Sequence, residues 1–331
     1  MTQPFNAILA EEVNGKPTAS LRQLHLADLP DEPVLIDVEY STLNYKDGLA
    51  MTGKGRICRT LPLICGIDLS GIVKESSDST WKQGDRVVIN GYGLSESYNG
   101  GYSQFQRVKA EWPVLLPDGL STLDAMAIGT AGYTAMLCVQ AIEDHGARPG
   151  DGPILVTGAA GGVGSIAISL LSTLGYEVHA STGRADTQKE FLQGLGASEV
   201  IDRRQLSDTS KPLEKERWLG VVDTVGSQTL ATTIAQTRRE GIVTACGLAG
   251  GMDLPSSVAP FILRGVTLRG IDSVMASYQR REKAWSRLGS IMNRDHLKNL
   301  SRVVPMTEIL ALGPAILAGE IRGRIIVDVN Q

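Results

Sequence analysis

A glycine-rich turn is the strongest chemical signal in the sequence. It runs from Thr157 to Gly164, between an apolar run at 154–157 and a second apolar run at 163–174. Glycine permits a tight turn and lets the backbone approach a pyrophosphate, and the N-terminus of a following helix offers N–H groups to the phosphates. The spacing is GxxGxxG rather than GxGxxG, so the prediction rests on the strand and helix that flank the turn. We predict a dinucleotide site with contacts from Ala160, Gly161, Gly162, Val163 and Gly164.

The residues after the second strand indicate which dinucleotide is used. An NAD site usually places Asp or Glu about 20 residues after the glycines, where it accepts from the ribose 2′-hydroxyl. This sequence has Ser181, Thr182, Gly183 and Arg184 there instead. Hydroxyls and a guanidinium suit a 2′-phosphate through charge-assisted hydrogen bonds. We therefore predict NADPH, with the alternative that Arg184 is a solvated loop residue.

The elements around this site follow two patterns. Short β-type runs separated by Gly, Pro, Asp and Asn fill the first part of the chain, at 5–11, 34–42, 67–74, 86–90 and 102–108. A helix is expected at 123–140. Strands and helices then alternate, with strands at 154–157, 177–182, 200–202, 220–224, 241–246 and 266–271 and helices at 163–174, 188–195 and 230–237. Such alternation predicts an α/β fold with a doubly wound parallel Rossmann sheet.

The pattern changes again after Asp272. Helices are expected at 278–292 and 308–317, and a last strand at 324–329. These elements return the chain to the first domain, which makes that domain discontinuous. We therefore predict a catalytic domain of residues 1–124 and 273–331 and a cofactor-binding domain of residues 125–272.

Composition excludes several classes of protein. The net charge is −4, and no run of five Lys or Arg occurs, so a nucleic-acid partner is not expected. We see neither a secretory signal nor 18 uninterrupted apolar residues, so we expect no membrane span and a cytoplasmic protein. The four cysteines form no CxxC pair and are predicted to be reduced thiols.

Several longer stretches carry a family resemblance. They begin at Leu43, Thr52, Gly129, Asp223, Ala245 and Pro260, and read LNYKD, TGKG, GTAGYTAML, DTVG, ACGLAGG and PFILR. With the glycine turn, they resemble the zinc-free, quinone-oxidoreductase-like branch of the medium-chain dehydrogenase/reductases, and within it the NADPH-dependent acrylyl-CoA reductases. The resemblance implies a GroES-like β-rich catalytic domain, a Rossmann domain, a homodimer and reduction of acryloyl-CoA to propionyl-CoA.

One departure within that superfamily concerns zinc. Zinc-containing members carry Gly-His-Glu in the first domain, and this chain has Gly66-Ile67-Asp68 in its place. The four-cysteine lobe is also missing, and the four histidines show no ligand spacing. We therefore predict no metal ligands.

Conjugate reduction without a metal needs a hydrogen-bond donor for the enolate oxygen. The candidate is Tyr45, which is expected to polarise the carbonyl, donate the proton or contact the nicotinamide; a packing role at a strand end is the alternative. Asn44 is expected to orient substrate or cofactor, and Asp47 to cap the following helix. Asp68 is expected to line or support the cleft, through a functional or a structural hydrogen bond.

Further cofactor contacts are expected outside the glycine turn. Gly247 and Leu248 follow the fifth strand and Ser273 follows the sixth, where loops face the ligand crevice. The remaining candidates are Thr130 and Thr134 on the helix entering the cofactor domain, Ile262 in the PFILR stretch, and Arg324 as a phosphate contact.

Two cationic clusters are candidates for the CoA phosphates, Lys54 with Arg56 and Arg59, and Arg280 with Arg281 and Lys283. The alternative for both is a solvated charged face. Two other functions also stay open. One is an NADPH-dependent quinone or alkenal reductase, and the other is an NADPH-binding protein without turnover.

Overall fold

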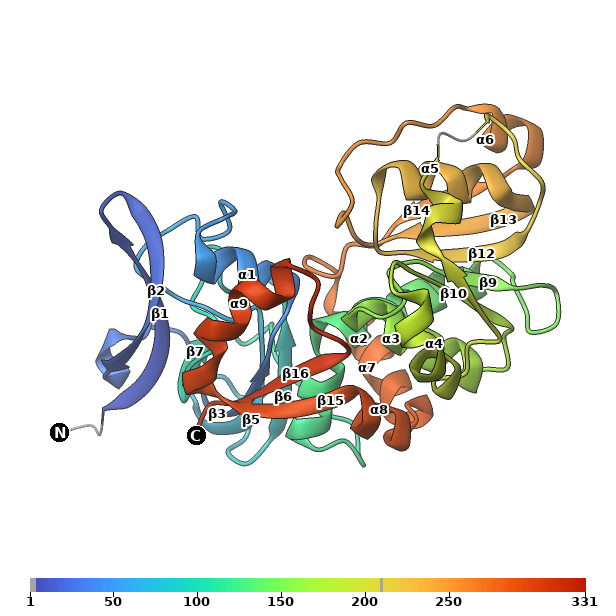
Figure 1. Ribbon diagram of the computed structural model, residues 1–331. Helices are drawn as coiled ribbons and strands as arrows, with labels where there is room; N and C mark the ends of the chain where they lie inside the picture. Colours follow the sequence, from blue (N-terminus) through green and yellow to red (C-terminus); the bar gives the residue numbers. More distant parts are fainter. Residues whose placement is uncertain (1–3, 209–210) are drawn as a thin grey trace. The chain divides into compact units, whose positions relative to one another are not determined.

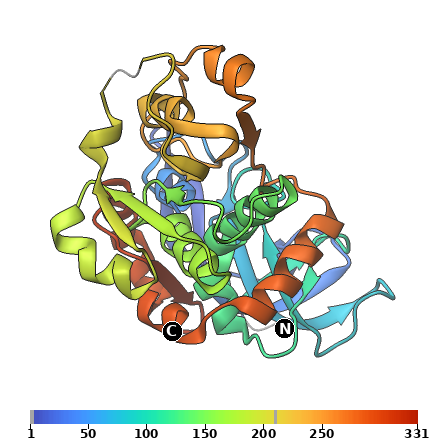
Figure 2. The same cartoon turned by 90° about the vertical axis from the view of Figure 1, so that its right-hand side faces the viewer.

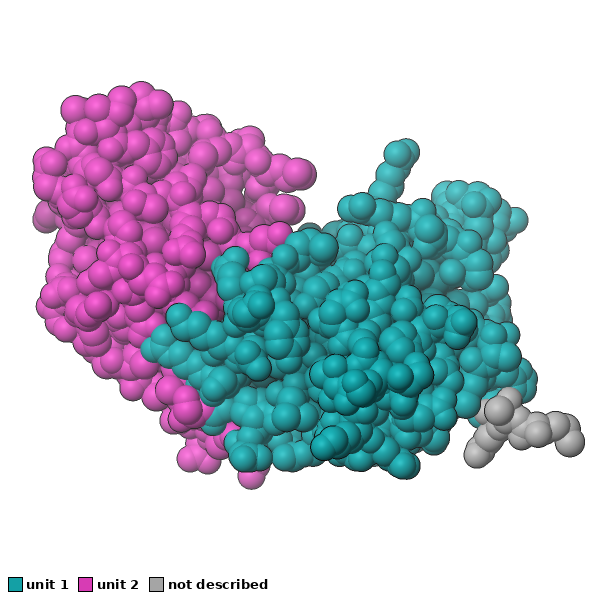
Figure 3. Space-filling model, turned by 180° about the vertical axis from the view of Figure 1, so that it is seen from behind, with its two compact units in different colours: residues 1–130, 273–289, 300–331 teal, residues 131–272, 290–299 magenta. Residues whose placement is uncertain are grey.

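The computed structural model describes residues 4–208 and 211–331, which form two compact units (Figure 1). Unit 1 contains residues 1–130, 273–289 and 300–331, and unit 2 contains residues 131–272 and 290–299 (Figure 3). The chain thus enters unit 2 at residue 131, returns to unit 1 at 273, and enters unit 2 a second time for the short segment 290–299. The sequence-based assignment of residues 1–124 and 273–331 to catalysis and of residues 125–272 to cofactor binding stays a prediction.

Unit 1 is built on two sheets whose strands pair antiparallel, except that β15 and β16 pair parallel. One sheet has the order β15-β16-β3-β5-β6-β8, with β7 also paired to β3, and a second has the order β2-β1-β4. The apolar faces of these strands bury a core that includes Val34, Leu69 and Tyr102. The strand bounds are β1 Phe5–Val13, β2 Lys16–Leu24, β3 Val34–Thr42, β4 Leu63–Ile64, β5 Asp68–Ser76, β6 Arg86–Asn90, β7 Phe105–Val108, β8 Val114–Leu115, β15 Ser301–Pro305 and β16 Arg324–Asp328.

Unit 2 holds a six-stranded sheet in which every adjacent pair is parallel, with the order β11-β10-β9-β12-β13-β14. Successive strands extend outward from β9 in one direction and then from β12 in the other, so the order reverses between these two strands. Ligands of such sheets bind where the order reverses, at the carboxyl ends of the strands. The bounds are β9 Ile154–Val156, β10 Val178–Thr182, β11 Glu199–Asp202, β12 Trp218–Asp223, β13 Thr237–Ala245 and β14 Thr267–Gly270.

Helices cover both faces of this sheet (Figures 1 and 2). α3 (Gly162–Thr173) and α4 (Ala185–Gly194) pack against β9, β10 and β11. α5 (Ser227–Gln236) and α6 (Ala259–Arg264) pack on β12 and β13. The predicted doubly wound architecture is confirmed. The other helices are α1 Tyr45–Thr52, α7 Tyr278–Ile291, α8 Arg294–Leu300 and α9 Ile309–Leu317.

One helix, α2 (Thr122–Asp144), is long and apolar enough to cross a membrane, with a mean hydropathy of 1.4 in its most apolar window. However, 94% of that window is buried within the protein. Gly129 also interrupts the helical backbone, with φ of 53° and ψ of −164°. Burial and interruption are what a core helix shows, so α2 is assigned to the protein interior.

The predicted elements differ from the structure at one long strand, β2, and at several shorter elements. β2, β4, β8, β15, α6 and α8 were not predicted, and β7 begins at Phe105 and not at Tyr102. Two-residue strands carry too few residues for an alternating pattern. α1 begins at Tyr45, with Asn44 at the N-cap position and Asp47 as the third helical residue. The Asp47 carboxylate accepts from the Asn44 amide in a capping box, so its predicted capping role is confirmed, although Asn44 holds the N-cap position.

Candidate functional site

The glycine turn joins β9 to α3 as predicted. Gly158 has φ of 59°, and a Cβ there would lie 2.1 Å from Thr224 Oγ1. A Cβ on Gly164 would lie 2.5 Å from the Gly158 carbonyl oxygen. The backbone of α3 therefore packs directly against the backbone of the turn, and only glycine fits at position 164. α3 begins after Gly161, and no side chain caps its first turn. The N-terminal amides at 162–164 therefore offer the donors and the positive helix end that a pyrophosphate requires.

A buried carboxylate holds this turn against the neighbouring strand. Thr157 Oγ1 donates to Asp223 Oδ1 at 2.7 Å, and the Gly226 amide donates to Asp223 Oδ2 at 2.8 Å. The Thr224 hydroxyl donates back to the Thr157 carbonyl at 3.0 Å. Burial raises the pKa of Asp223, although these hydrogen bonds oppose the shift. The network fixes the turn relative to β12, and sequence reasoning did not identify it.

The predicted 2′-phosphate residues lie at the end of β10. Ser181 and Thr182 are buried, whereas Gly183 is exposed. Arg184 precedes the first turn of α4, and its amide donates to Thr182 Oγ1 at 3.3 Å. A second guanidinium, which the sequence analysis missed, lies here, because a Cβ on Gly183 would come 2.7 Å from Arg203 Nε.

The end of β11 adds one carboxylate to this region. Asp202 pairs in register with Thr182, so a negative charge lies near the expected phosphate position. Arg204 neutralises it through hydrogen bonds from Nε at 2.9 Å and Nη2 at 2.5 Å, and these contacts lower the pKa of Asp202. Because Arg204 pairs with Asp202, the positive charge of Arg203 next to Gly183 adds to the net charge of this region.

An open depression of about 500 Å³ lies at the carboxyl ends of β13 and β14. It contains the predicted Gly247 and Leu248, together with residues 245, 246 and 270–272. The Cys246 thiol on its wall donates to the Asp223 carbonyl at 3.3 Å, which connects this loop to the glycine-turn network. Ile262, also predicted to contact cofactor, is 74% exposed on α6. Thr134 is buried in the α2 portion of unit 2.

In unit 1 the Asn-Tyr-Lys-Asp stretch forms the start of α1. Asn44 is the N-cap in a reciprocal capping box with Asp47, whose Oδ2 accepts from the Asn44 amide at 2.8 Å. Asp47 Oδ1 accepts from the Ile67 amide at 2.9 Å and so ties α1 to the segment before β5. Tyr45 is the first helical residue, and 45% of it is exposed. The tyrosine is thus fixed at the backbone, while its side chain is accessible.

Asp68 lies at the centre of a buried polar cluster. Its Oδ2 accepts from the Thr130 amide at 2.8 Å and from Asn44 Nδ2 at 3.3 Å. The Gly129 interruption of α2 creates this contact and leaves space for Arg324, because a Cβ on Gly129 would lie 2.5 Å from Arg324 Nη2. Asp68 is fully buried, and its predicted role in lining or supporting the cleft stays a prediction.

Arg324 is buried, with 3% of its surface exposed. Its guanidinium donates to the Ala127 carbonyl at 3.1 Å, to Asn44 Oδ1 at 3.3 Å and to Thr42 Oγ1 at 2.8 Å. These contacts give it a role in positioning Asn44. The phosphate contact expected from the sequence stays a prediction.

Two carboxyl groups in this cluster titrate abnormally. Burial, aided by the nearby Asp68 charge, raises the pKa of Asp47 to about 7. Burial also raises the pKa of Asp68, while the Thr130 amide and the Arg324 charge oppose that shift. Acids with raised pKa values are typical of functional sites, and in buried networks they also occur for structural reasons.

The last residues predicted from the sequence lie elsewhere in unit 1. The Ser273 carbonyl accepts from Arg281 Nη2 at 3.3 Å. Arg281 is 1% exposed and also donates to the carbonyls of Ala276, Asn90 and Val274. The second cationic cluster proposed for CoA phosphates is therefore wrong for Arg281, whose charge is used inside unit 1. Lys54, Arg56 and Arg59 are all exposed.

Within residues 4–208 and 211–331, no three His, Cys, Asp or Glu side chains gather where they could hold a metal ion. The absence of metal from the reaction stays a prediction.

Known families match both units. A model described as an alcohol dehydrogenase GroES-like domain matches residues 30–118, and one described as a zinc-binding dehydrogenase matches residues 162–290. Acrylyl-CoA reductase AcuI from Ruegeria pomeroyi is 50% identical over 98% of this chain and 99% of its own length. The chain belongs to the acrylyl-CoA reductase group of the medium-chain dehydrogenase/reductases. The family and fold expected from the sequence are confirmed.

Two solved structures extend the comparison. Escherichia coli YhdH with bound NADPH is 48% identical, covers 98% of this chain and 100% of its own, and superposes with a TM-score of 0.95. Bacillus subtilis YhfP, described as a putative quinone oxidoreductase, is 44% identical over 99% of both chains. Its structure with bound NAD has a TM-score of 0.96.

Proposed function

We propose that this chain is an NADPH-dependent oxidoreductase that reduces the activated C=C bond of acryloyl-CoA to give propionyl-CoA. The observation that carries the proposal is the identity of 50% to an acrylyl-CoA reductase over nearly the whole of both chains. It agrees with the function and the cofactor expected from the sequence.

Unit 2 has the features that NADPH binding requires. The first turn of α3 has no side-chain cap, so its amides are available to the pyrophosphate. Gly158 and Gly164 carry no side chain, so the turn and the helix pack closely and no side chain lies in the way of the phosphates. Arg184 and Arg203 flank Gly183 with positive charge, and Arg204 pairs with Asp202. Charge-assisted hydrogen bonds to a 2′-phosphate are the expected result.

The chemistry divides between cofactor and protein. Bound NADPH supplies the hydride for the β-carbon. The chain must then stabilise negative charge on the thioester oxygen and deliver a proton to the α-carbon. Tyr45 is our candidate for the donor, because its accessible phenol lies at the N-terminus of α1, where Asn44 and Asp47 fix the backbone. Asn44 and Asp68 are the proposed positioning residues, joined by the hydrogen bond from Asn44 Nδ2 to Asp68 Oδ2.

A substrate panel tests this function. Purified protein is given NADPH and, in parallel, acryloyl-CoA, crotonyl-CoA, acrolein and benzoquinone, and the loss of absorbance at the reduced-nicotinamide band is followed. We expect the highest kcat/KM with acryloyl-CoA, and propionyl-CoA as product by mass spectrometry. No turnover of either thioester would overturn the proposal.

The second candidate is an NADPH-dependent quinone or alkenal reductase. It is favoured by the 44% identity to the putative quinone oxidoreductase of Bacillus subtilis. A kcat/KM for benzoquinone or acrolein above that for acryloyl-CoA would select it.

We also propose a homodimer in the cytoplasm. Support for the dimer is family resemblance, together with β14 at the edge of its sheet and the exposed Ile262 and Leu263 of α6. Support for the compartment is that all four cysteines are free thiols. Light scattering at micromolar concentration should give twice the chain mass of 35.3 kDa. A mass of one chain would overturn the dimer.

A further inference from the structure

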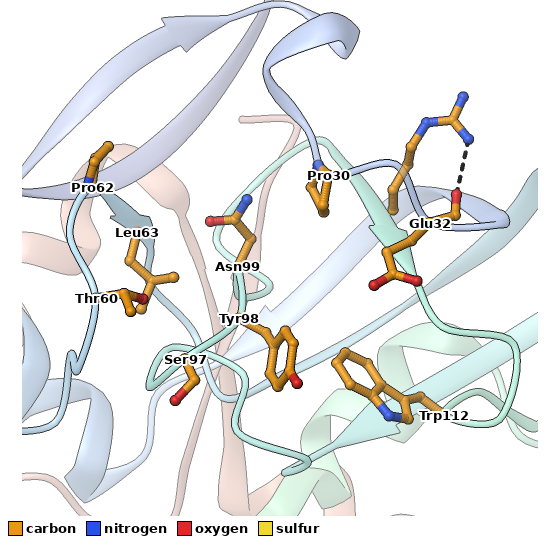
Figure 4. Close-up of a pocket in the computed structure, with 10 residues that line it drawn as sticks. Pro30, Glu32, Thr60, Pro62, Leu63, Ser97, Tyr98, Asn99 and Trp112 are labelled. Atoms are coloured by element: carbon orange, nitrogen blue, oxygen red, sulfur yellow. Dashed lines mark hydrogen bonds between the residues drawn. The ribbon is translucent and has the colours of Figure 1, made fainter.

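Unit 1 contains a cavity of about 220 Å³ that the proposed chemistry does not use (Figure 4). Its walls come from four separate segments, around Pro30 and Glu32, at Thr60–Leu63, at Ser97–Asn99, and at Arg107 and Trp112. The volume suits one fused heterocycle better than an entire cofactor.

An aromatic wall gives this cavity its chemical character. The indole of Trp112 is 7% exposed and has Tyr92 stacked on it, with ring centroids 5.5 Å apart and planes 9° apart. Tyr98 meets Trp112 edge-to-face at 4.9 Å and is 40% exposed. Figure 4 shows both rings beside the cavity. Lys109 Nζ lies over the Tyr98 ring, 4.9 Å from its centroid. A planar ligand would stack on the exposed part of this ring.

Polar groups beside this ring suit a purine. Asn99 Oδ1 accepts from the Ile64 amide at 3.1 Å, which orients its Nδ2 as a donor for a ring nitrogen. Arg107 donates to the Glu32 carbonyl at 3.3 Å, so the backbone at Glu32 is held in place. The Glu32 carboxylate is an acceptor for an exocyclic amine. Stacking plus one donor and one acceptor is how proteins hold an adenine.

Positively charged residues lie next to the cavity wall formed by Thr60–Leu63. The segment leading into Thr60 carries Lys54, Arg56 and Arg59, all exposed. The Arg59 amide donates to the Glu96 carbonyl at 2.7 Å, which fixes this segment against residue 97 of the cavity. The Arg59 guanidinium already lies 3.6 Å from Glu96 Oε2, but its side chain is 70% exposed. Phosphates on a ligand in the cavity would meet these cations.

The cavity is also connected to the candidate proton donor. Lys46 Nζ contacts Glu96 Oε1 at 2.5 Å. Tyr45 and Ser97 are the direct chain neighbours of these two residues, so this ion pair joins the first turn of α1 to a segment of the cavity wall. The flexible arm of the ligand would run between them along unit 1.

We propose that this cavity is the binding subsite for the adenine of the CoA thioester, stacked on Tyr98, with the ribose phosphates on Lys54, Arg56 and Arg59. This inference rests on the proposed function and names the part of the substrate that unit 1 recognises away from the reacting bond. Such remote contacts supply binding energy for the reaction.

The test compares substrates with and without the nucleotide. KM and kcat are measured for acryloyl-CoA and for S-acryloyl-pantetheine, which lacks the adenosine phosphates. We expect Tyr98→Ala to raise the KM for acryloyl-CoA about ten-fold and to leave the KM for the pantetheine ester unchanged. Tyr98→Phe keeps the stacking face and should behave like the wild type. Leu21→Ala, at an equally exposed position of β2 (40%), is the matched control.

A binding measurement separates this subsite from the proposed reaction. Adenosine 3′,5′-bisphosphate is titrated into protein saturated with NADP⁺, which keeps the probe out of the dinucleotide site. We expect binding to wild type and about ten-fold weaker binding to Tyr98→Ala. If neither thioester is reduced while the bisphosphate binds in this way, the proposed function fails and the subsite stands. An equal KM for acryloyl-CoA in wild type and Tyr98→Ala overturns the subsite.

Discussion

The guanidinium of Arg203 lies against the backbone of Gly183, with no space for a β-carbon between them. This places a second cation near the end of β10, where Arg184 precedes α4. The two residues follow different strands, and we propose that both bind the 2′-phosphate of NADPH.

Removing Arg203 should change cofactor preference. Arg203→Ala is expected to raise the KM for NADPH about 10- to 100-fold, because a charged hydrogen bond contributes about 1.5–3 kcal/mol, and to leave the KM for NADH unchanged. Steady-state kinetics with both cofactors measures this. Lys189→Ala, on exposed α4, is the control. An equal loss with NADH and NADPH would contradict the assignment.

The glycine turn offers a matched pair of substitutions. Gly164→Ala places a methyl group 2.5 Å from the Gly158 carbonyl oxygen, so the turn must open, and NADPH affinity should fall about ten-fold or more. Gly194→Ala at the end of α4 meets no atom within 4 Å and should stabilise the fold by about 0.5–1 kcal/mol. Calorimetric titration and thermal unfolding measure both variants. Unchanged NADPH binding in Gly164→Ala would refute the proposed contact.

Tyr45 can be tested by removing one oxygen atom. Tyr45→Phe should lower kcat with acryloyl-CoA about 10²-fold if the phenol stabilises the enolate or supplies the proton. The Kd for NADPH should not change, and Tyr278→Phe should keep full activity. A normal kcat combined with a raised Kd for NADPH would instead assign Tyr45 to the cofactor.

Asp47 predicts a pH dependence of stability. Its pKa of about 7 exceeds the ordinary value of 3.8, so between these values the folded protein holds a proton that the unfolded chain has released. The free energy of unfolding should therefore fall as pH rises from about 4 to about 7, by at most about 4 kcal/mol.

Urea unfolding across this pH range measures the effect. Asp47→Asn should flatten the slope, although it also weakens the hydrogen bond from Asn44 or from Ile67. The exposed Asp118→Asn makes the same charge change and should keep the wild-type slope. Parallel slopes for wild type and Asp47→Asn would contradict the assignment.

The features of the fold that depend on residues close together in the sequence were predicted correctly. The glycine turn and the parallel strands follow from local periodicity and turn chemistry, and both were predicted. Arg203 was missed because only the pairing of β11 with β10 brings it to Gly183. The buried position of Arg281 follows from carbonyls at Asn90 and Val274, which the local pattern does not indicate.

The same distinction explains α1. Asp47 was predicted to cap this helix from its residue type, and it does so through the Asn44 amide. Its second contact, with the Ile67 amide, joins α1 to the segment before β5 and does not follow from the local pattern.

The most direct test of the account is to follow the hydride itself. NADPH carrying deuterium at C4 of the nicotinamide, in both stereochemical forms, is supplied with acryloyl-CoA, and the product is analysed by NMR and mass spectrometry. We predict one deuterium at the β-carbon of propionyl-CoA from one of the two forms. Product without deuterium, or with deuterium only at the α-carbon, would contradict hydride delivery to the β-carbon.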